Sequence, residues 1–167
     1  MTNSDPKTLY FSIGPHLRLF GPGEFMLLTG LPFGIRPSLS HRDGNAFVRR
    51  LFPRSVLGVP RDQPLHLKIL DLLDLYDNMS GLDNEDVVHI CSLVMVETVL
   101  LGRQRHHDVD DVLLNVVHDL AVWNAFPWGS YIWSFMYNHM DCFLDSRFKE
   151  VSNKMTLYGF VHPFEVI

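Results

Sequence analysis

The stretch DNEDVVHICSLVMVETVLLG, residues 83–102, decides the fold because it has the marks of one long buried helix. Asp83 is placed to cap the first turn, and Asp86 follows three residues later. Gly102 is placed to end the helix, since glycine readily adopts the left-handed conformation that helix ends use. The middle is apolar on nearly every side, so we predict that this helix lies at the centre of a helical domain.

Helical patterns continue on both sides of this stretch. Before it, residues 64–77 place five apolar side chains on one helix face: Leu65, Ile69, Leu72, Leu73 and Tyr76. After it, we predict a helix from Asp108 to Pro127, with Asp110 and Asp111 in its first turn, where the helix dipole favours negative charge. A further helix is predicted over residues 130–144.

The N-terminal part carries strand signals. LYFSI and LRLF, separated by GPH, predict a β-hairpin over residues 9–20. Pro22 and Gly30 bound a predicted short helix, and AFVRRLF, residues 46–52, predicts another. We therefore predict a mainly α protein: a single helical domain over residues 9–160 with a small N-terminal β-hairpin, preceded by a flexible terminus at residues 1–8.

The composition is that of a globular protein. The chain has 167 residues, of which 47% are apolar and 20% are charged, and this length suffices to bury a core without disulfides. Cys91 and Cys142 lie inside apolar helical patterns, and the first ten residues are polar. We therefore predict an intracellular, reducing setting in which both cysteines are buried.

Charge is distributed unevenly along the chain, whose net charge is −5. Six arginines face a single acid between residues 36 and 61: Arg36, Arg42, Arg49, Arg50, Arg54 and Arg61. Residues 71–119 instead hold eleven acids against two arginines. One interpretation is a contact for an acidic partner, such as a nucleic acid, on the basic segment. The interpretation that we favour is that the two parts attract each other or are simply solvated.

An aromatic stretch, NAFPWGSYIWSFMYNHM, spans residues 124–140. Together with the four residues before it, it covers residues 120–140, which have the length of a membrane span and no Asp, Glu, Lys or Arg, but Pro127 and Gly129 interrupt them where lipid could not satisfy the freed backbone groups. We predict a soluble helix–turn–helix instead, with no membrane contact. Trp128 and Trp133 fall off the apolar stripe of the second helix, so we predict that they are half exposed and form a face for a protein partner.

Few residues have the pattern of a metal or catalytic site. His106, His107, Asp108, Asp110 and Asp111 are candidate metal ligands, but adjacent histidines do not share a helix face, so we predict no metal and no cofactor. Glu97 is the one acid deep in an apolar helix, and it is either functional or satisfied by an arginine or a backbone group. We favour pairing, with Arg18, Arg49 or Arg50 as the partner, and we predict no enzymatic activity.

Several segments together resemble a known family. LRLFGPGEFMLLTGLPFG, VETVLLGR, VDDVLLNVVHDLAVWNAFPWGSYIWSFMY and MTLYGF are similar, in this order, to an uncharacterised plant domain. That domain occurs in proteins derived from Mutator-like transposable elements, often upstream of a SUMO-protease-like domain of the Ulp type. The resemblance implies a plant source and a setting inside the cell, which includes the nucleus, but no catalytic residue.

The C-terminus departs from the family pattern. The family continues with an apolar helix after Tyr-Gly-Phe, whereas here His162 and Pro163 interrupt VHPFEVI. We therefore expect residues 161–167 to be a truncated or divergent segment with exposed apolar side chains. From all these features we predict a non-catalytic interaction or accessory module. The alternative is a nucleic-acid-associated module that uses the segment Arg36–Arg61.

Overall fold

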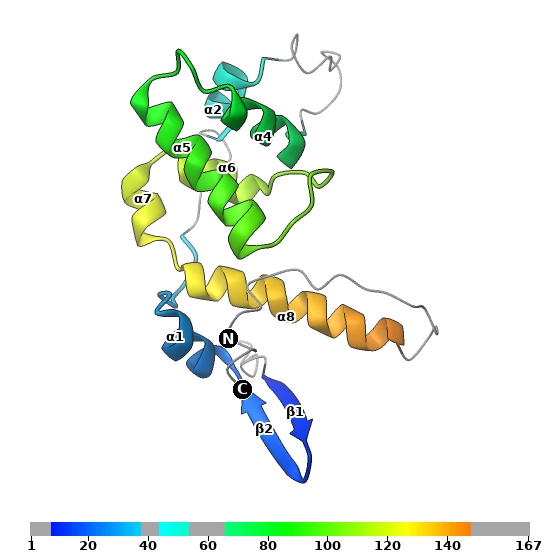
Figure 1. Cartoon of the computed structure of the whole chain (residues 1–167). Coiled ribbons are helices and arrows are strands. Elements are labelled where there is room, and N and C mark those ends of the chain that lie inside the picture. The colour runs from blue at the N-terminus through cyan, green and yellow to red at the C-terminus, as the bar shows by residue number, and fades with distance from the viewer. Residues whose placement is uncertain (1–7, 38–43, 54–65, 148–167) are drawn as a thin grey trace. The chain divides into compact units, whose positions relative to one another are not determined.

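The computed structural model describes residues 8–37, 44–53 and 66–147 (Figure 1). Its fold is mainly helical with a small antiparallel hairpin near the N-terminus, which confirms the predicted fold class. Backbone contacts divide the chain into two compact units, and each is considered by itself below. Unit 1 comprises residues 1–36 and 127–167, and unit 2 comprises residues 37–126. The single domain predicted over residues 9–160 stays a prediction.

The hairpin of unit 1 forms where the sequence predicts it. Strand β1, Leu9–Ile13, pairs antiparallel with strand β2, His16–Phe20, and Gly14 has a φ of 59° in the turn between them. Leu9 lies opposite Phe20, and both side chains are buried. Because side chains alternate between the two faces of a strand, the neighbouring pair of Tyr10 and Leu19 lies on the opposite face.

Helix α1, Pro22–Thr29, follows directly and has the predicted ends. Its first turn is fixed by Glu24, whose carboxylate accepts the backbone N–H of Gly21 at 2.8 Å. Its last turn ends at Gly30, whose φ of 68° is in the left-handed region. The helix buries Phe25 completely.

Helix α8, Trp128–Arg147, packs against α1 and begins two residues before the predicted start. The ring centroid of Trp133, on α8, lies 5.7 Å from the ring centroid of Phe20 and 5.5 Å from that of Phe25. Residues 31–34 also lie against the start of α8, since the N–H of Gly129 donates to the carbonyl of Pro32 at 2.8 Å. Unit 1 is therefore centred on aromatic rings.

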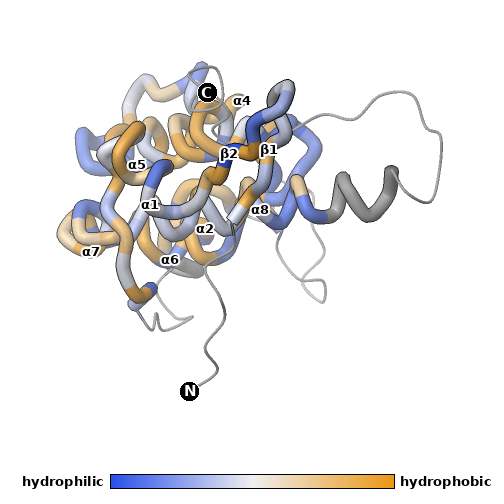
Figure 2. Tube along the Cα trace, turned by 90° about the horizontal axis from the view of Figure 1, so that it is seen from below, coloured by the Kyte–Doolittle hydropathy of each residue, from blue (hydrophilic) through white to orange (hydrophobic). Residues whose placement is uncertain are grey.

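Unit 2 is built from helices. They are α2 (Gly44–Leu51), α4 (Ile69–Asp77), α5 (Asn84–Val94), α6 (Asp111–Val117) and α7 (Leu120–Ala125), and a π-helical segment, η1 (Met95–Leu100), extends α5. Helix α5 contacts α4 and α6, and α2 contacts α6. Figure 2 shows hydrophobic residues along α4, α5, α6 and α7. The fully buried side chains include Ile69, Leu72, Ile90, Leu93 and Leu113.

The central stretch has the predicted ends but not the predicted interior. Asp83 caps α5 by accepting the N–H of Asp86 at 2.8 Å, and Gly102 has a φ of 60° just after η1. The winding changes to a π-helix at Met95, which the sequence did not indicate. Cys91 is half-buried, so the prediction that it is buried is wrong, and the side chain of Cys142 lies outside the described residues.

The single helix predicted from Asp108 to Pro127 is wrong, because the structure has two short helices there. Helix α6 is capped by Asp110, which accepts the N–H of Val112 at 2.8 Å, and Asp108 pairs with Lys68 in an isolated β-bridge. Asp119 then accepts the N–H groups of Ala121 and Val122, at 2.8 and 3.3 Å, and starts α7. A short acidic side chain that binds nearby backbone N–H groups competes with the continuous helix ladder, and here it ends one helix and starts the next.

Within residues 8–37, 44–53 and 66–147, no helix combines the length and the apolar content that a bilayer crossing requires.

Candidate functional site

Glu97 lies at the centre of a buried polar network in unit 2. Its side chain is fully buried, and both carboxylate oxygens accept from Arg103, at 3.3 and 3.1 Å. The backbone N–H of Asp110 donates to the same carboxylate at 3.0 Å. The sequence indicated that an arginine pairs with Glu97, but Arg18, Arg49 and Arg50 were the wrong candidates. The loop after η1 turns back and brings Arg103, only six residues away, onto the carboxylate.

The network explains what Glu97 does in the fold. It ties the loop of residues 101–110 to η1 from both ends, because Arg103 and Asp110 lie near the two ends of that loop. Burial raises the pKa of Glu97 above its usual value, and the bond from Asp110 and the charge of Arg103 oppose this shift. π-Helical turns often occur at functional sites, but here the acid has the donors that a buried carboxylate needs. The geometry therefore gives Glu97 a structural role.

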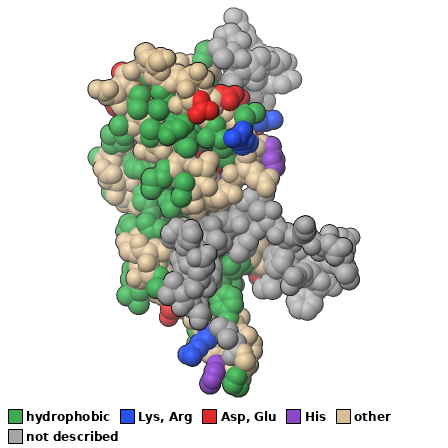
Figure 3. Space-filling model, viewed as in Figure 1, with side chains coloured by type: hydrophobic (Ala, Val, Ile, Leu, Met, Phe, Trp, Pro, Cys, Tyr) green, Lys and Arg blue, Asp and Glu red, His purple; other side chains and the backbone are tan. Residues whose placement is uncertain are grey.

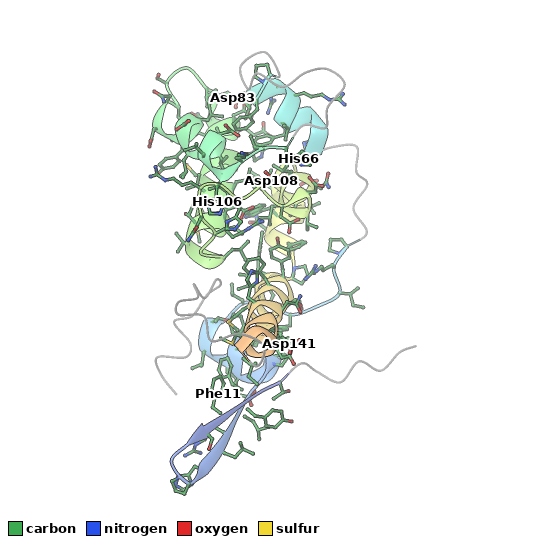
Figure 4. All side chains as sticks on the ribbon, turned by 90° about the vertical axis from the view of Figure 1, so that its right-hand side faces the viewer. Phe11, His66, Asp83, His106, Asp108 and Asp141 are labelled. Carbon is green, nitrogen blue, oxygen red and sulfur yellow. The ribbon has the colours of Figure 1, made fainter. Side chains whose placement is uncertain are left out.

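The predicted group of histidines and acids is only partly brought together. The rings of His106 and His107 have centroids 4.3 Å apart, and Asp108 approaches His66 at 3.8 Å. Figure 4 labels His66, His106 and Asp108. Asp110 is instead used to cap α6. Across the part of the chain that the structure describes, no three His, Cys, Asp or Glu side chains are grouped so that they could hold a metal ion.

The structure describes three of the six arginines between residues 36 and 61. Arg50 forms an ion pair with Asp86, which agrees with attraction between the basic and acidic parts of the sequence. Arg36 lies over the ring of Tyr131, 5.0 Å from its centroid, and Arg49 is exposed at the end of α2. Arg42, Arg54 and Arg61 lie outside the described residues. A contact with an acidic partner stays a prediction.

A second buried cluster, which sequence reasoning missed, joins α2 to α5. Asp86 and His89 are 4% and 2% exposed, and they follow each other at a spacing of three on α5. Phe47 and Arg50 have the same spacing on α2. Arg50 pairs with Asp86, while the ring of Phe47 meets that of His89 edge-on at 5.8 Å. The sequence contains both pairs at a spacing of three residues, which puts each pair on one helix face. Only the packing of α2 against α5 shows that the two pairs meet.

His89 has the less satisfied position in this α2–α5 cluster. Neither of its ring nitrogens has a hydrogen-bond partner among the described residues. Burial lowers the pKa of His89 below its usual value of 6.5, while the carboxylates of Glu85 and Asp86 act in the opposite direction. The ring therefore fits its surroundings as the neutral imidazole.

Trp128 and Trp133 are buried, 9% and 3% exposed, so the prediction that they are half exposed is wrong. Trp133 packs on Phe20 and Phe25, because α8 is covered by β2 as well as by α1 and therefore buries a wider arc than one apolar stripe. The ring of Trp128 meets that of Tyr131 edge-on at 6.2 Å. The partner face inferred from these tryptophans depended on their exposure.

Unit 1 exposes other apolar side chains, which the sequence analysis did not identify. Tyr10, Leu17 and Leu19 are 65%, 65% and 57% exposed, and the hairpin register places them with Ser12 on one face. We call these four residues the hairpin face. The sequences LYFSI and HLRLF contained the signal for this exposure, since each strand has large apolar residues on both of its alternating faces. Elsewhere, Val88, Met95 and Val99 are exposed on α5 and η1, and Figure 3 shows hydrophobic side chains at the surface of those helices.

Comparison with known proteins gives one match. The family model described as "Domain of unknown function (DUF1985)" matches residues 1–139. No curated protein matches the chain, and no solved structure does so either.

Proposed function

We propose that this chain, which belongs to the DUF1985 family of domains of unknown function, is a non-catalytic protein-interaction module. The observation that carries the proposal is the hairpin face, where Tyr10, Leu17 and Leu19 are each more than half exposed. Single exposed apolar residues are normal on a protein surface, whereas several on one face of a small sheet are typical of an interaction site.

The chemistry of this face defines the partner. It presents two leucines, a tyrosine and a serine, and no charged side chain. An uncharged apolar surface of another protein fits it best, because a charged group placed there would lose water without gaining an opposite charge. The other face of the same hairpin buries Leu9 and Phe20 in unit 1, so the hairpin face is held on a packed support.

The buried acid supports a non-catalytic role. A catalytic carboxylate needs access to substrate, whereas Glu97 is fully buried and bonded to Arg103 and to the N–H of Asp110. Its removal would disturb the loop of residues 101–110 before it disturbed any chemistry. This observation favours a binding function for the chain over a hydrolytic one.

The wider context is proposed from the sequence resemblance. We place this module in a plant protein derived from a Mutator-like transposable element, as an accessory to a protease domain of the Ulp type, and inside the cell, including the nucleus. Support comes from the EFMLLTGL and FPWG segments, which fall at α1 and at the start of α8. Both segments have structural roles, EFMLLTGL in unit 1 and FPWG where unit 2 ends and unit 1 resumes, so they support common ancestry and do not define the partner.

The test uses the whole chain as bait in a plant cell extract. Leu17 and Leu19 are changed together to serine, and Val99→Ser is the matched control because Val99 is 62% exposed in unit 2. We expect a protein partner that binds the parent chain saturably and binds the Val99→Ser chain equally well. Its affinity for the doubly substituted chain should be at least tenfold lower. The proposal fails if no saturable partner is found, or if the two variants bind it equally.

The alternative, a nucleic-acid-associated module, rests on Arg49, which is exposed at the end of α2. Binding to phosphates releases counterions, so affinity for duplex or single-stranded DNA should fall steeply as salt rises. Arg49→Gln should weaken that binding and reduce its salt dependence. Absent binding, or binding that does not change with salt, removes this alternative.

A further inference from the structure

The α2–α5 cluster combines a paired charge with an unpaired imidazole. Asp86 and Arg50 neutralise each other across the two helices, whereas His89, one turn further along α5, contacts the ring of Phe47. Both nitrogens of His89 lack a hydrogen-bond partner among the described residues although the residue is 2% exposed. A neutral imidazole tolerates such a site at a modest cost, but an imidazolium does not, because its charge and its second N–H would also be unsatisfied.

We propose that His89 is a proton-sensitive latch, whose protonation releases α2 from α5 within unit 2. The charged and titratable groups around it are Glu85 and Asp86 on its own helix, Arg50 on α2 and His118 at the end of α6. Glu85, at a spacing of four residues, and Asp86, at a spacing of three, both share a helix face with His89 and both favour its charged form. Asp86 is the one that Arg50 binds, so an imidazolium that engages Asp86 competes with Arg50 for the same carboxylate.

This competition acts on the contact between α2 and α5, while α2 also contacts α6. Arg50 is 58% exposed in its side chain, so it can turn to water once Asp86 is engaged by His89. The imidazolium also draws more water than the neutral ring, which weakens its contact with Phe47. Both effects act in the same direction, because Phe47 and Arg50 are the two α2 residues that meet the cluster.

The direction of the pH effect follows from burial. Desolvation lowers the pKa of His89 in the folded chain, so the unfolded or opened chain binds the proton more tightly than the folded one. The stability that depends on neutral His89 is therefore complete above pH 6.5 and is lost as the pH falls through the folded pKa. Each unit by which the pKa is lowered changes the opening equilibrium by about tenfold.

The test measures hydrogen exchange of the whole chain at pH 7.5 and pH 5.5, after correction for the intrinsic rate at each pH. We expect α2 amides to lose protection at the lower pH, by at most about tenfold because the usual pKa of 6.5 lies one unit above pH 5.5, while α8 amides in unit 1 keep theirs. His89→Phe keeps an aromatic ring against Phe47 but cannot be protonated, so its α2 protection should be the same at both pH values. His106→Gln, at an exposed histidine of the same unit that is not among the groups facing His89, should behave like the parent.

A second measurement covers the case in which His89→Phe does not fold. NMR titration of the histidine rings in the unaltered chain should show His89 titrating below pH 6.5, together with shifts of the α2 amides at the same midpoint. The proposal is wrong if α2 protection is the same at both pH values in the parent chain. It is also wrong if His89 titrates at or above pH 6.5, or if a folded His89→Phe chain loses α2 protection as the parent does.

Discussion

Unit 1 is packed around aromatic rings, whereas unit 2 also buries side chains that titrate. In unit 1, Phe20, Phe25 and Trp133 form the contact between the hairpin, α1 and α8. In the described residues, the buried polar and charged side chains are Asp86, His89 and Glu97, and all three belong to unit 2. The stability of unit 1 therefore depends on buried area and shape, while that of unit 2 depends in addition on ion pairs and on pH.

The comparison also separates two kinds of polar burial inside unit 2. Glu97 is bonded from both ends of one loop, so its charge has partners at a fixed place. His89 has no such partner and is accommodated only while it is neutral. A satisfied buried charge fixes a structure, and an unsatisfied titratable group makes a structure sensitive to its surroundings.

The largest effects should come from the aromatic side chains that both units bury completely. Phe25→Ala in unit 1 and Phe126→Ala in unit 2 should each lower the free energy of unfolding by about 3–5 kcal/mol, since each leaves a cavity in a packed core. Trp123→Ala should cost less, because Trp123 is only half-buried. Urea unfolding followed by circular dichroism measures this. A melt of Phe25→Ala that matches the parent would contradict the aromatic packing of unit 1.

Glu97 provides a test of the polar core. Glu97→Ala should cost about 3 kcal/mol or slightly more at pH 7, because it leaves Arg103 and the N–H of Asp110 without their acceptor. Glu97→Gln should cost about 1 kcal/mol or less, since the amide oxygen can still accept from that N–H. The matched control is Glu85→Ala, at an exposed acid of α5, which should stay within about 0.5 kcal/mol of the parent.

The pH dependence of these Glu97 variants has a defined sign. Burial raises the folded pKa of Glu97, so its contribution to stability is complete below its unfolded pKa and is lost as the pH rises through the folded one. Glu97→Gln cannot titrate, so its free energy of unfolding should rise relative to that of the parent as the pH goes from 4 to 7. A fall relative to the parent over this range would mean that the ion pair with Arg103 outweighs desolvation.

A smaller effect should come from close backbone packing in unit 1. A Cβ atom added at Gly129 would lie 2.4 Å from the ring of Phe33 and 2.8 Å from the carbonyl oxygen of Leu31. Gly129→Ala should therefore cost about 1–3 kcal/mol, with no dependence on pH. Gly23→Ala in α1 has open space at the same atom and should be neutral or stabilise the chain by about 0.5 kcal/mol. Equal melting temperatures for the two variants would show that residues 31–33 move aside.

The elements with local signals were predictable. The hairpin alternates at period two, α1 lies between Pro22 and Gly30, and α5 starts at Asp83, because strand alternation, helix caps and glycine turns depend on residues close in sequence. The break between α6 and α7 could have been found as well. Asp119 is a capping residue, but its apolar neighbours on both sides made a continuous helix the simpler interpretation.

The functional surfaces could not be predicted in the same way. Trp128 and Trp133 were expected to be half exposed from the stripe of one helix, yet burial is set by everything that packs around it, and here α1 packs on α8 and Phe20 of β2 contacts Trp133. For the same reason, Tyr10, Leu17 and Leu19 look like core residues in the sequence but lie on the uncovered face of the hairpin. An amphipathic pattern predicts which face is buried only when the apolar residues fall on one face. In the hairpin and in α8, large apolar residues fall on more than one face.

The sequence by itself determined the class of the fold, the hairpin, the ends of α1 and of the α5–η1 stretch, and the burial of the acid Glu97. Only the tertiary structure decided that Arg103 is that arginine, that Phe47 and Arg50 of α2 meet His89 and Asp86 of α5, and which apolar face stays exposed. The physical reason is range. Caps, turns and periodicity act over a few residues, whereas ion pairing, desolvation and burial depend on which segments the folded chain brings together.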